Sequence, residues 1–190
     1  MDLSKSERRP RLAGYCLTRK KFLSPDEQRH LTDAIDRNLK NPGRHAQALM
    51  LAVALNTGGR AQEILNLRKL DFDPHARTLF LTGLKGSSDR EIPLPQWLGN
   101  QLIGFSKGLM PQDRFFPICY NRLRQIWVFW RPAQKPFHCL RHTFAINVYT
   151  RTMDVRLLQL ALGHKNIINT MIYVDFVYAQ SELKKRLLGG

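Results

Sequence analysis

Long apolar runs, cysteines and acidic residues are all scarce in this chain, and each shortage excludes a class of protein. No run approaches the roughly 20 apolar residues that a membrane-spanning helix needs, and the longest, residues 46–55, is typical of a core helix. The three cysteines, Cys16, Cys119 and Cys139, are odd in number and widely spaced, which suits a reducing compartment and argues against a disulfide framework. The N-terminal residues lack the apolar segment and cleavage site of a secretory signal.

The shortage of acidic residues leaves a large positive charge. Fifteen Asp and Glu face 30 Lys and Arg, which gives a net charge of +15 over 190 residues. With 43% hydrophobic residues the chain can bury a core, and its length suits one full-sized domain with a short tail. The charge therefore predicts a folded protein with a polyanionic partner, with nucleic acid favoured over an acidic membrane surface.

Much of this charge lies in a basic N-terminal arm, residues 1–21, where only two acidic residues occur. Such an arm is either a solvated tail or a segment that follows the phosphates of DNA, and the charge pattern alone does not separate the two. The arm residues that we expect to contact DNA are Arg8, Arg9, Arg11, Arg19, Lys20 and Lys21.

The patterning after the arm predicts a mainly α-helical fold with one small antiparallel β-sheet (α+β). The sequence Ser24-Pro25-Asp26-Glu27 has the serine, proline and glutamate spacing of a capped helix start, and that helix should end near residues 41–43. Alternating residues around a polar turn predict strands at 78–82 and 90–94, with Pro93 confining the second to an edge of the sheet or placing the proline at a strand end. Further helices are expected at 45–56, from 61 onward, and at 96–106, 119–130, 140–150, 155–162, 167–173 and 178–188.

Two segments place a cation beside glycines. Arg60 follows Gly58-Gly59 at a predicted helix N-terminus, where backbone amides favour an anion. Glu63, one turn later, either orients Arg60 or caps the helix. Lys85 lies on a glycine-flanked hairpin turn, from which it can reach a phosphate. Each cation taken alone is better explained as a solvated surface residue.

A third segment, residues 138–145, carries more information. His138 and Arg141 are three apart and share one face at a predicted helix start, which suits a phosphate whose charge changes during a reaction. His138 and His142, with Cys139 between them, also have zinc-like spacing, but no further ligand cluster accompanies them and we expect no metal. A further alternative is that both histidines are hydrogen-bonded structural residues.

The fourth segment places His164 directly after Gly163 and Tyr173 nine residues later, with a short helix between. Alone, such a tyrosine is typical of packing. Together, however, Arg60, Lys85, His138, Arg141, His164 and Tyr173 occur in the order and local contexts of the tyrosine recombinases, the phage integrase family. The resemblance covers about residues 22–178 and rests on the blocks TGGRAQEILNL, HCLRHTFA and LGHKNIINTMIY.

This resemblance implies the tyrosine recombinase catalytic-domain fold over residues 22–178 and a reaction at a DNA phosphate. Tyr173 would be the nucleophile, forming a 3′-phosphotyrosyl link and releasing a 5′-hydroxyl. Arg60 and Arg141 would bind the phosphate, because guanidinium groups are permanently charged and donate paired hydrogen bonds. Lys85 would be the general acid that protonates the leaving oxygen.

The resemblance also assigns supporting roles. His138 would take part in acid–base chemistry, and His164 would bond a non-bridging oxygen or place Tyr173. Glu63 would support the site. No metal or nucleotide cofactor is implied, and the chain has no Walker-type glycine loop. The C-terminal helical segment, residues 179–190, would dock on a neighbouring protomer, as such tails often do in this family.

Only a short segment precedes Ser24, so the chain resembles the small, catalytic-domain-only recombinases related to fimbrial phase-switch invertases. The expected partners are double-stranded DNA at a specific site, three further copies of the chain in a homotetramer on two DNA sites, and an accessory DNA-bending protein. The expected location is the cytoplasm of a bacterium, at the nucleoid, with a bacterial or phage gene. Two alternatives stay open: a type IB topoisomerase-like nicking-closing enzyme, and a DNA-binding regulator that has lost catalysis.

Overall fold

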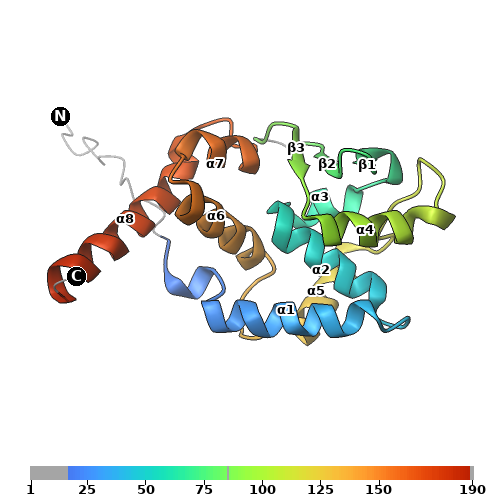
Figure 1. Ribbon diagram of the computed structural model, residues 1–190, viewed down its shortest axis with the longest axis horizontal. Helices are drawn as coiled ribbons and strands as arrows, with labels where there is room; N and C mark the ends of the chain where they lie inside the picture. The colour runs from blue at the N-terminus through green and yellow to red at the C-terminus, as the bar shows by residue number, and fades with distance from the viewer. Residues whose placement is uncertain (1–16, 85, 189–190) are drawn as a thin grey trace, which may run out of the picture.

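The computed structural model describes residues 17–84 and 86–188, and within them it is mainly helical with one small sheet (Figure 1). Arg8, Arg9, Arg11 and Lys85 lie outside the described residues. The strands β1 (Phe72–Asp73), β2 (Thr78–Leu81) and β3 (Arg90–Pro93) form an antiparallel sheet in that order. The helices are α1 (Pro25–Leu39), α2 (His45–Thr57), α3 (Ala61–Asn66), α4 (Gln96–Phe105), α5 (Tyr120–Trp130), α6 (Cys139–Thr152), α7 (Val155–Leu162) and α8 (Ile168–Leu188), with 3-10 turns at Arg19–Lys21, Lys69–Asp71 and Ser106–Gly108.

The start of α1 is the predicted capping box. Ser24 Oγ accepts a hydrogen bond from the Glu27 amide at 3.2 Å, and the Ser24 amide donates to Glu27 Oε2 at 2.7 Å. Leu31 and Ile35, four residues apart, form the buried face of the helix. The fold class predicted from the sequence is confirmed, as is the edge position of the strand that contains Pro93.

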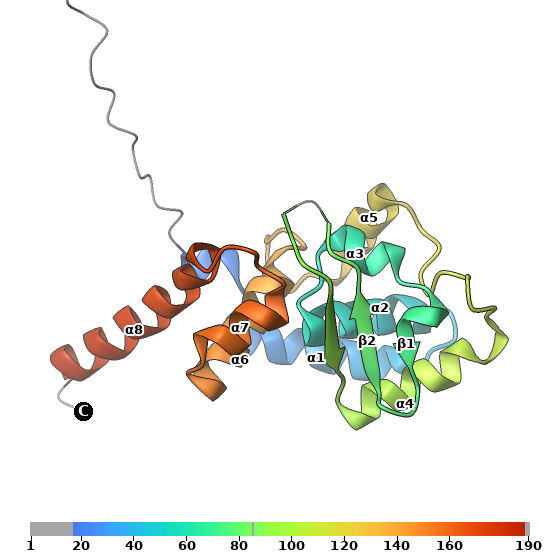
Figure 2. The same cartoon turned by 90° about the horizontal axis from the view of Figure 1, so that it is seen from above.

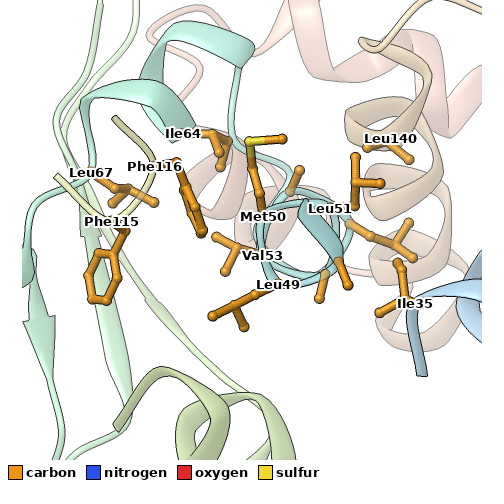
Figure 3. Close-up of a cluster of buried hydrophobic side chains, with 14 of the residues drawn as sticks. Ile35, Leu49, Met50, Leu51, Val53, Ile64, Leu67, Phe115, Phe116 and Leu140 are labelled. Carbon is orange, nitrogen blue, oxygen red and sulfur yellow. The ribbon is translucent and has the colours of Figure 1, made fainter. Parts of the chain in front are cut away.

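Helix α2 is the centre of the main core, as its apolar sequence predicts. Every residue from 48 to 55 is buried. In Figure 3, Leu51 points toward Leu140 of α6 and Ile35 of α1, while Met50 lies on the side of Ile64 of α3. Burying each such side chain contributes about 1.5–3 kcal/mol. We call this large group of buried residues, which also includes the sheet and α4–α5, the α2 cluster.

A second, smaller group of buried residues lies where α6, α7 and the first half of α8 pack together, on one side of the molecule in Figures 1 and 2. Its phenylalanine Phe22 meets the ring of Phe176 edge to face at 5.1 Å between centroids. Leu17 is also buried here, so the chain already packs within the segment predicted as the basic arm. We call this group the Tyr173 cluster; its buried members are Leu17, Phe22, Ala145, Val148, Tyr149, Leu158, Leu162 and Tyr173.

The C-terminal part differs from the prediction of two helices at 167–173 and 178–188. A single continuous helix, α8, spans Ile168–Leu188. The predicted break is wrong because Val174, Phe176 and Val177 pack against the Tyr173 cluster and no glycine or proline interrupts them. The end of α8 extends away from the body of the molecule in both views. Among the described residues, no helix is both long and apolar enough to cross a membrane.

Candidate active site

Arg60 is positioned by the junction of α2 and α3. Gly58 ends α2 with a φ of 61°, a conformation that favours glycine, and Arg60 then occupies the N-cap of α3. Glu63 fills both roles that its spacing allowed: its carboxylate accepts from the Arg60 amide at 2.8 Å and from the Arg60 guanidinium at 3.1 Å. The guanidinium is therefore aimed by a residue one turn away.

Glu63 has a second cationic partner that the sequence did not reveal. Arg90 of β3 donates to Glu63 Oε2 at 2.7 Å, and both side chains are almost fully buried. Burial raises the pKa of Glu63, but the bonds and charge of Arg90 and the Arg60 amide outweigh it and hold that pKa below its usual value. The Glu63 carboxylate is thus charged at neutral pH and holds the Arg60 guanidinium in place.

Arg141 of α6 is held in a different way. It is 2% exposed and donates to two backbone carbonyls, Gly58 O and Leu162 O, each at 2.7 Å. These carbonyls lie at the C-terminal ends of α2 and α7, where the helix dipole carries partial negative charge. Burial and the charges of Arg60 and Arg90 lower the pKa of Arg141 to about 9, so it stays charged at pH 7.

The β2–β3 hairpin is tied to the turn after α7. Ser87 Oγ accepts from Arg60 at 2.6 Å and donates to Gly163 O at 3.1 Å, and the Ser88 amide donates to the same carbonyl. Lys85 precedes Ser87 by two residues. Ser87 therefore connects the hairpin that carries Lys85 to both Arg60 and the turn of His164.

Two of the predicted histidines line the same region. His164 follows Gly163, whose φ is 65°, and its Nδ1 lies 3.0 Å from Thr170 Oγ1 of α8. His138 occupies the N-cap position of α6, one turn before Arg141. Desolvation and the charges of Arg141 and Arg60 lower the pKa of each imidazole to about 4. Both rings are therefore neutral at pH 7.

Tyr173 of α8 is 1% exposed, and its hydroxyl lies 2.9 Å from Nδ1 of His142 on α6. The sequence left His142 between a zinc ligand and a structural histidine, and the resemblance gave it no role. In the structure it contacts the side chain that the resemblance makes the nucleophile. Within residues 17–84 and 86–188, no group of three or more His, Cys, Asp or Glu side chains is placed to hold a metal.

One cavity of about 720 Å³ collects these side chains. Two guanidinium groups, three neutral imidazoles, one phenol and one carboxyl group line it, and the cations and the phenol suit a phosphodiester that is attacked by an oxygen nucleophile. Five of the six residues singled out by the resemblance line this cavity, and the sixth, Lys85, lies outside the described residues. The ionisable lining residues are Arg60, His138, Arg141, His142, His164, Tyr173 and Asp175.

The arm residues that the structure describes lie beside α8. Arg19 donates to Gln180 Oε1 at 3.0 Å, and Arg19 and Lys20 are exposed. The charge of Lys21 contributes to a lowered pKa of His142, which lines the cavity. The end of the basic arm is thus next to the tyrosine-bearing helix rather than remote from it.

A sequence model of the phage integrase family matches residues 21–180, most of the chain and all of the cavity. The chain belongs to the phage integrase family. Among curated relatives, tyrosine recombinase XerA of Thermococcus kodakarensis is 30% identical over 166 residues, which cover 80% of this chain and 57% of that protein. A tyrosine recombinase of Pseudothermotoga lettingae is 30% identical over 167 residues, covering 82% and 56%. The chain spans little more than half the length of these relatives.

Solved structures of phage integrases and related recombinases share the fold. The catalytic domain of bacteriophage HP1 integrase superposes with a TM-score of 0.63 at 25% identity, covering 87% of this chain and 94% of that domain. XerH site-specific recombinase, in a post-cleavage complex with palindromic difH substrate, gives a TM-score of 0.67 at 24% identity and covers 88% and 52%. The described residues thus have the fold of a phage integrase catalytic domain.

Proposed function

We propose that this phage integrase family member is a site-specific DNA recombinase that cleaves and rejoins DNA through a 3′-phosphotyrosyl intermediate. The carrying observation is that Tyr173, Arg60 and Arg141 line one cavity, so that a phenol and two permanent cations meet at one place. A phosphodiester seated there would have both guanidinium groups on its non-bridging oxygens. These cations stabilise the crowded, more negative transition state of attack at phosphorus.

In the proposed reaction, Tyr173 Oη forms a bond to phosphorus while the bond to the 5′-oxygen breaks. Lys85 gives its proton to the leaving oxygen, and its position two residues before the anchored Ser87 supports this role. His164 donates from Nε2 to a phosphate oxygen, because its Nδ1 faces the Thr170 hydroxyl. Rejoining reverses these steps with a second 5′-hydroxyl, so neither a metal nor a nucleotide is required.

We further propose double-stranded DNA at a specific site as the substrate, with four copies of the chain on two sites. Leu183, Leu187 and Leu188 are exposed on the end of α8, and these three leucines would dock on a neighbouring protomer. Exposed Arg19 and Lys20 would contact phosphates. We also propose an accessory DNA-bending protein as a partner and the nucleoid in the bacterial cytoplasm as the location. Inversion, integration and resolution of DNA would all use this chemistry.

The nucleophile can be tested with trapped DNA adducts. A binding site is first selected from a random duplex library with the Tyr173→Phe protein, and a nicked suicide duplex of that sequence is then incubated with each variant. Wild type should become covalently linked to DNA and Tyr173→Phe should not. Tyr178→Phe, which changes an exposed tyrosine on the same helix, is the matched control and should behave as wild type. An adduct in Tyr173→Phe would move the nucleophile elsewhere.

Assembly needs a separate experiment, because a type IB topoisomerase-like enzyme would form the same adduct as a monomer. Truncation after Gln180 removes the exposed leucines of α8 but keeps Phe176 and its contact with Phe22. We expect this truncated protein to form the adduct but to lose recombination between two sites on a plasmid. Unchanged recombination would contradict docking through α8, and plasmid relaxation without recombination in wild type would favour the topoisomerase alternative. A regulator that has lost catalysis would bind DNA without either activity.

A further inference from the structure

We propose that His142 is a further catalytic residue, which accepts the phenolic proton of Tyr173 as its oxygen bonds to phosphorus. This inference rests on the proposed role of Tyr173 as nucleophile. The resemblance places acid–base chemistry on His138, but the ring nitrogen that lies 2.9 Å from the Tyr173 hydroxyl is His142 Nδ1. The ring centroids of His142 and Tyr173 are 5.7 Å apart.

The position of His142 follows from helical spacing. His138 begins α6, and His142 lies one turn later, so the two rings meet edge to face at 4.7 Å between centroids. His138 is at the exposed start of the helix, whereas His142 is 5% exposed, between His138 and Tyr173. His138 is therefore the outer histidine, on the cavity, and His142 is the inner histidine, next to the phenol of Tyr173.

Burial makes a local base necessary. A phenol has an ordinary pKa near 10, and Tyr173 is almost fully removed from solvent water, so its proton needs an acceptor within the protein. Burial, followed by the proximity of the His138 imidazole and the positive charges of Arg141 and Lys21, lowers the pKa of His142 to about 3. The imidazole is therefore neutral and has one nitrogen that can accept the hydroxyl proton.

Substrate binding would strengthen this base. A phosphate between Arg60 and Arg141 places negative charge beside the cations that oppose protonation of His142, and a nearby negative charge favours the protonated imidazole. Proton acceptance would thus become more favourable when DNA occupies the cavity. Without DNA, the same hydrogen bond holds the phenol in its protonated form.

The step is balanced in protons and bonds. As the bond from Tyr173 Oη to phosphorus forms, the phenolic proton moves to His142 Nδ1. The bond to the 5′-oxygen breaks, and that oxygen receives a proton from the general acid, for which we propose Lys85. On rejoining, protonated His142 returns the proton to the phenol oxygen as it leaves phosphorus. No oxidation or reduction takes place.

The test measures single-turnover adduct formation on the selected nicked duplex, with either an ordinary 5′-oxygen or a bridging 5′-sulfur at the scissile phosphate. Sulfur leaves without a general acid, so it should restore activity to Lys85→Ala. His142→Asn keeps a hydrogen-bonding group near the Nδ1 position but accepts no proton at neutral pH. We expect it to be slower than wild type by about 100-fold or more on both substrates, because the lost group acts on the nucleophile.

A chemical rescue separates proton acceptance from a purely structural role. Adduct formation by His142→Ala should increase when imidazole is added but not when pyrazole is added, since pyrazole has a similar shape and is a much weaker base. Circular dichroism and DNA binding, which are expected to match wild type, show that each variant is folded.

Three results would overturn the inference: wild-type rates in His142→Asn, rescue of that variant by the 5′-sulfur, or equal rescue by the two azoles. Wild-type protein and Tyr173→Phe are assayed in parallel. If wild type forms no adduct, the proposed function itself fails. If wild type reacts and the His142 variants react equally well, only this inference fails.

Discussion

The residues that line the cavity come from elements packed on two cores, a large one (the α2 cluster) and a small one (the Tyr173 cluster). Arg60 and Glu63 are attached to the large core through α3, and Glu63 pairs with the buried Arg90, whereas Tyr173 lies on α8, which packs on the small core; α6, which carries Arg141 and His142, contributes to both. Resistance to local unfolding follows the number of buried contacts, so Arg60 on α3 should be held more rigidly than Tyr173 on α8. A more rigid phosphate site and the proposed nucleophile on a looser helix would suit the proposed reaction, in which the tyrosine must approach DNA and later leave it.

The largest effect should come from the buried ion pair between Glu63 and Arg90. Glu63→Gln leaves the buried Arg90 without its counter-charge, and breaking a buried pair in this way costs about 3–5 kcal/mol. Urea unfolding measures the loss. Glu91→Gln, at the neighbouring exposed position of β3, is the control and should change stability by less than about 0.5 kcal/mol. A loss below about 1 kcal/mol in Glu63→Gln would mean that the pair does not anchor this side of the cavity.

The two cores can be compared directly with equivalent cavities. Leu51→Ala in the α2 cluster and Leu158→Ala in the Tyr173 cluster each remove a fully buried leucine, for which the usual cost is about 2–5 kcal/mol. We expect Leu51→Ala near the upper end and Leu158→Ala near the lower end, because a small cluster relaxes around a cavity more easily. Hydrogen exchange should show lost protection in α8, but not in α2, for Leu158→Ala. Equal loss in both helices would remove the distinction between the cores.

Gly58 lies where the two cores meet, because its carbonyl accepts from Arg141 and its Cα faces Phe144. In Gly58→Ala the new methyl group would lie 2.4 Å from Phe144 Cδ1, and the φ of 61° costs a non-glycine residue about 1–2 kcal/mol. We expect a loss of about 2 kcal/mol or more in urea unfolding, together with slower adduct formation. Gly104→Ala, in α4 with nothing within 4 Å of the new methyl group, should instead stabilise the protein.

The smallest effect should be that of mild acid, and it should appear on the Tyr173 side. The folded protein lowers the pKa values of His138, His142 and His164, so the unfolded chain binds more protons than the folded one below about pH 6.5. Stability should therefore be complete above pH 6.5 and decline below it, and protonation of the buried His142 should cost at most about 1.4 kcal/mol between about pH 6.5 and pH 5.5. Hydrogen exchange corrected for intrinsic rates should show α8 losing protection before α2. Equal loss in both would contradict the assignment of these histidines to the looser side.

The site was predictable from the sequence only where its signals are local or belong to a family pattern. Arg60 and Glu63 are three residues apart, so their pairing follows from helical spacing. Arg90, by contrast, reaches Glu63 from 27 positions away, and nothing in the sequence around Arg90 distinguishes it from a surface strand residue. His142 was noticed as one of two spaced histidines, but its partner Tyr173 is 31 residues away.

The same division holds for the whole fold. The capped start of α1, the central place of α2 and the mixed helical and strand character are predictable from the residues alone, because capping and periodicity act within a few residues. The continuity of α8, the two-residue strand β1 and the bond from Ser87 to Gly163 are visible only in the folded chain. These features depend on packing and hydrogen bonds between segments distant in the chain, and such contacts leave no periodic pattern in either segment.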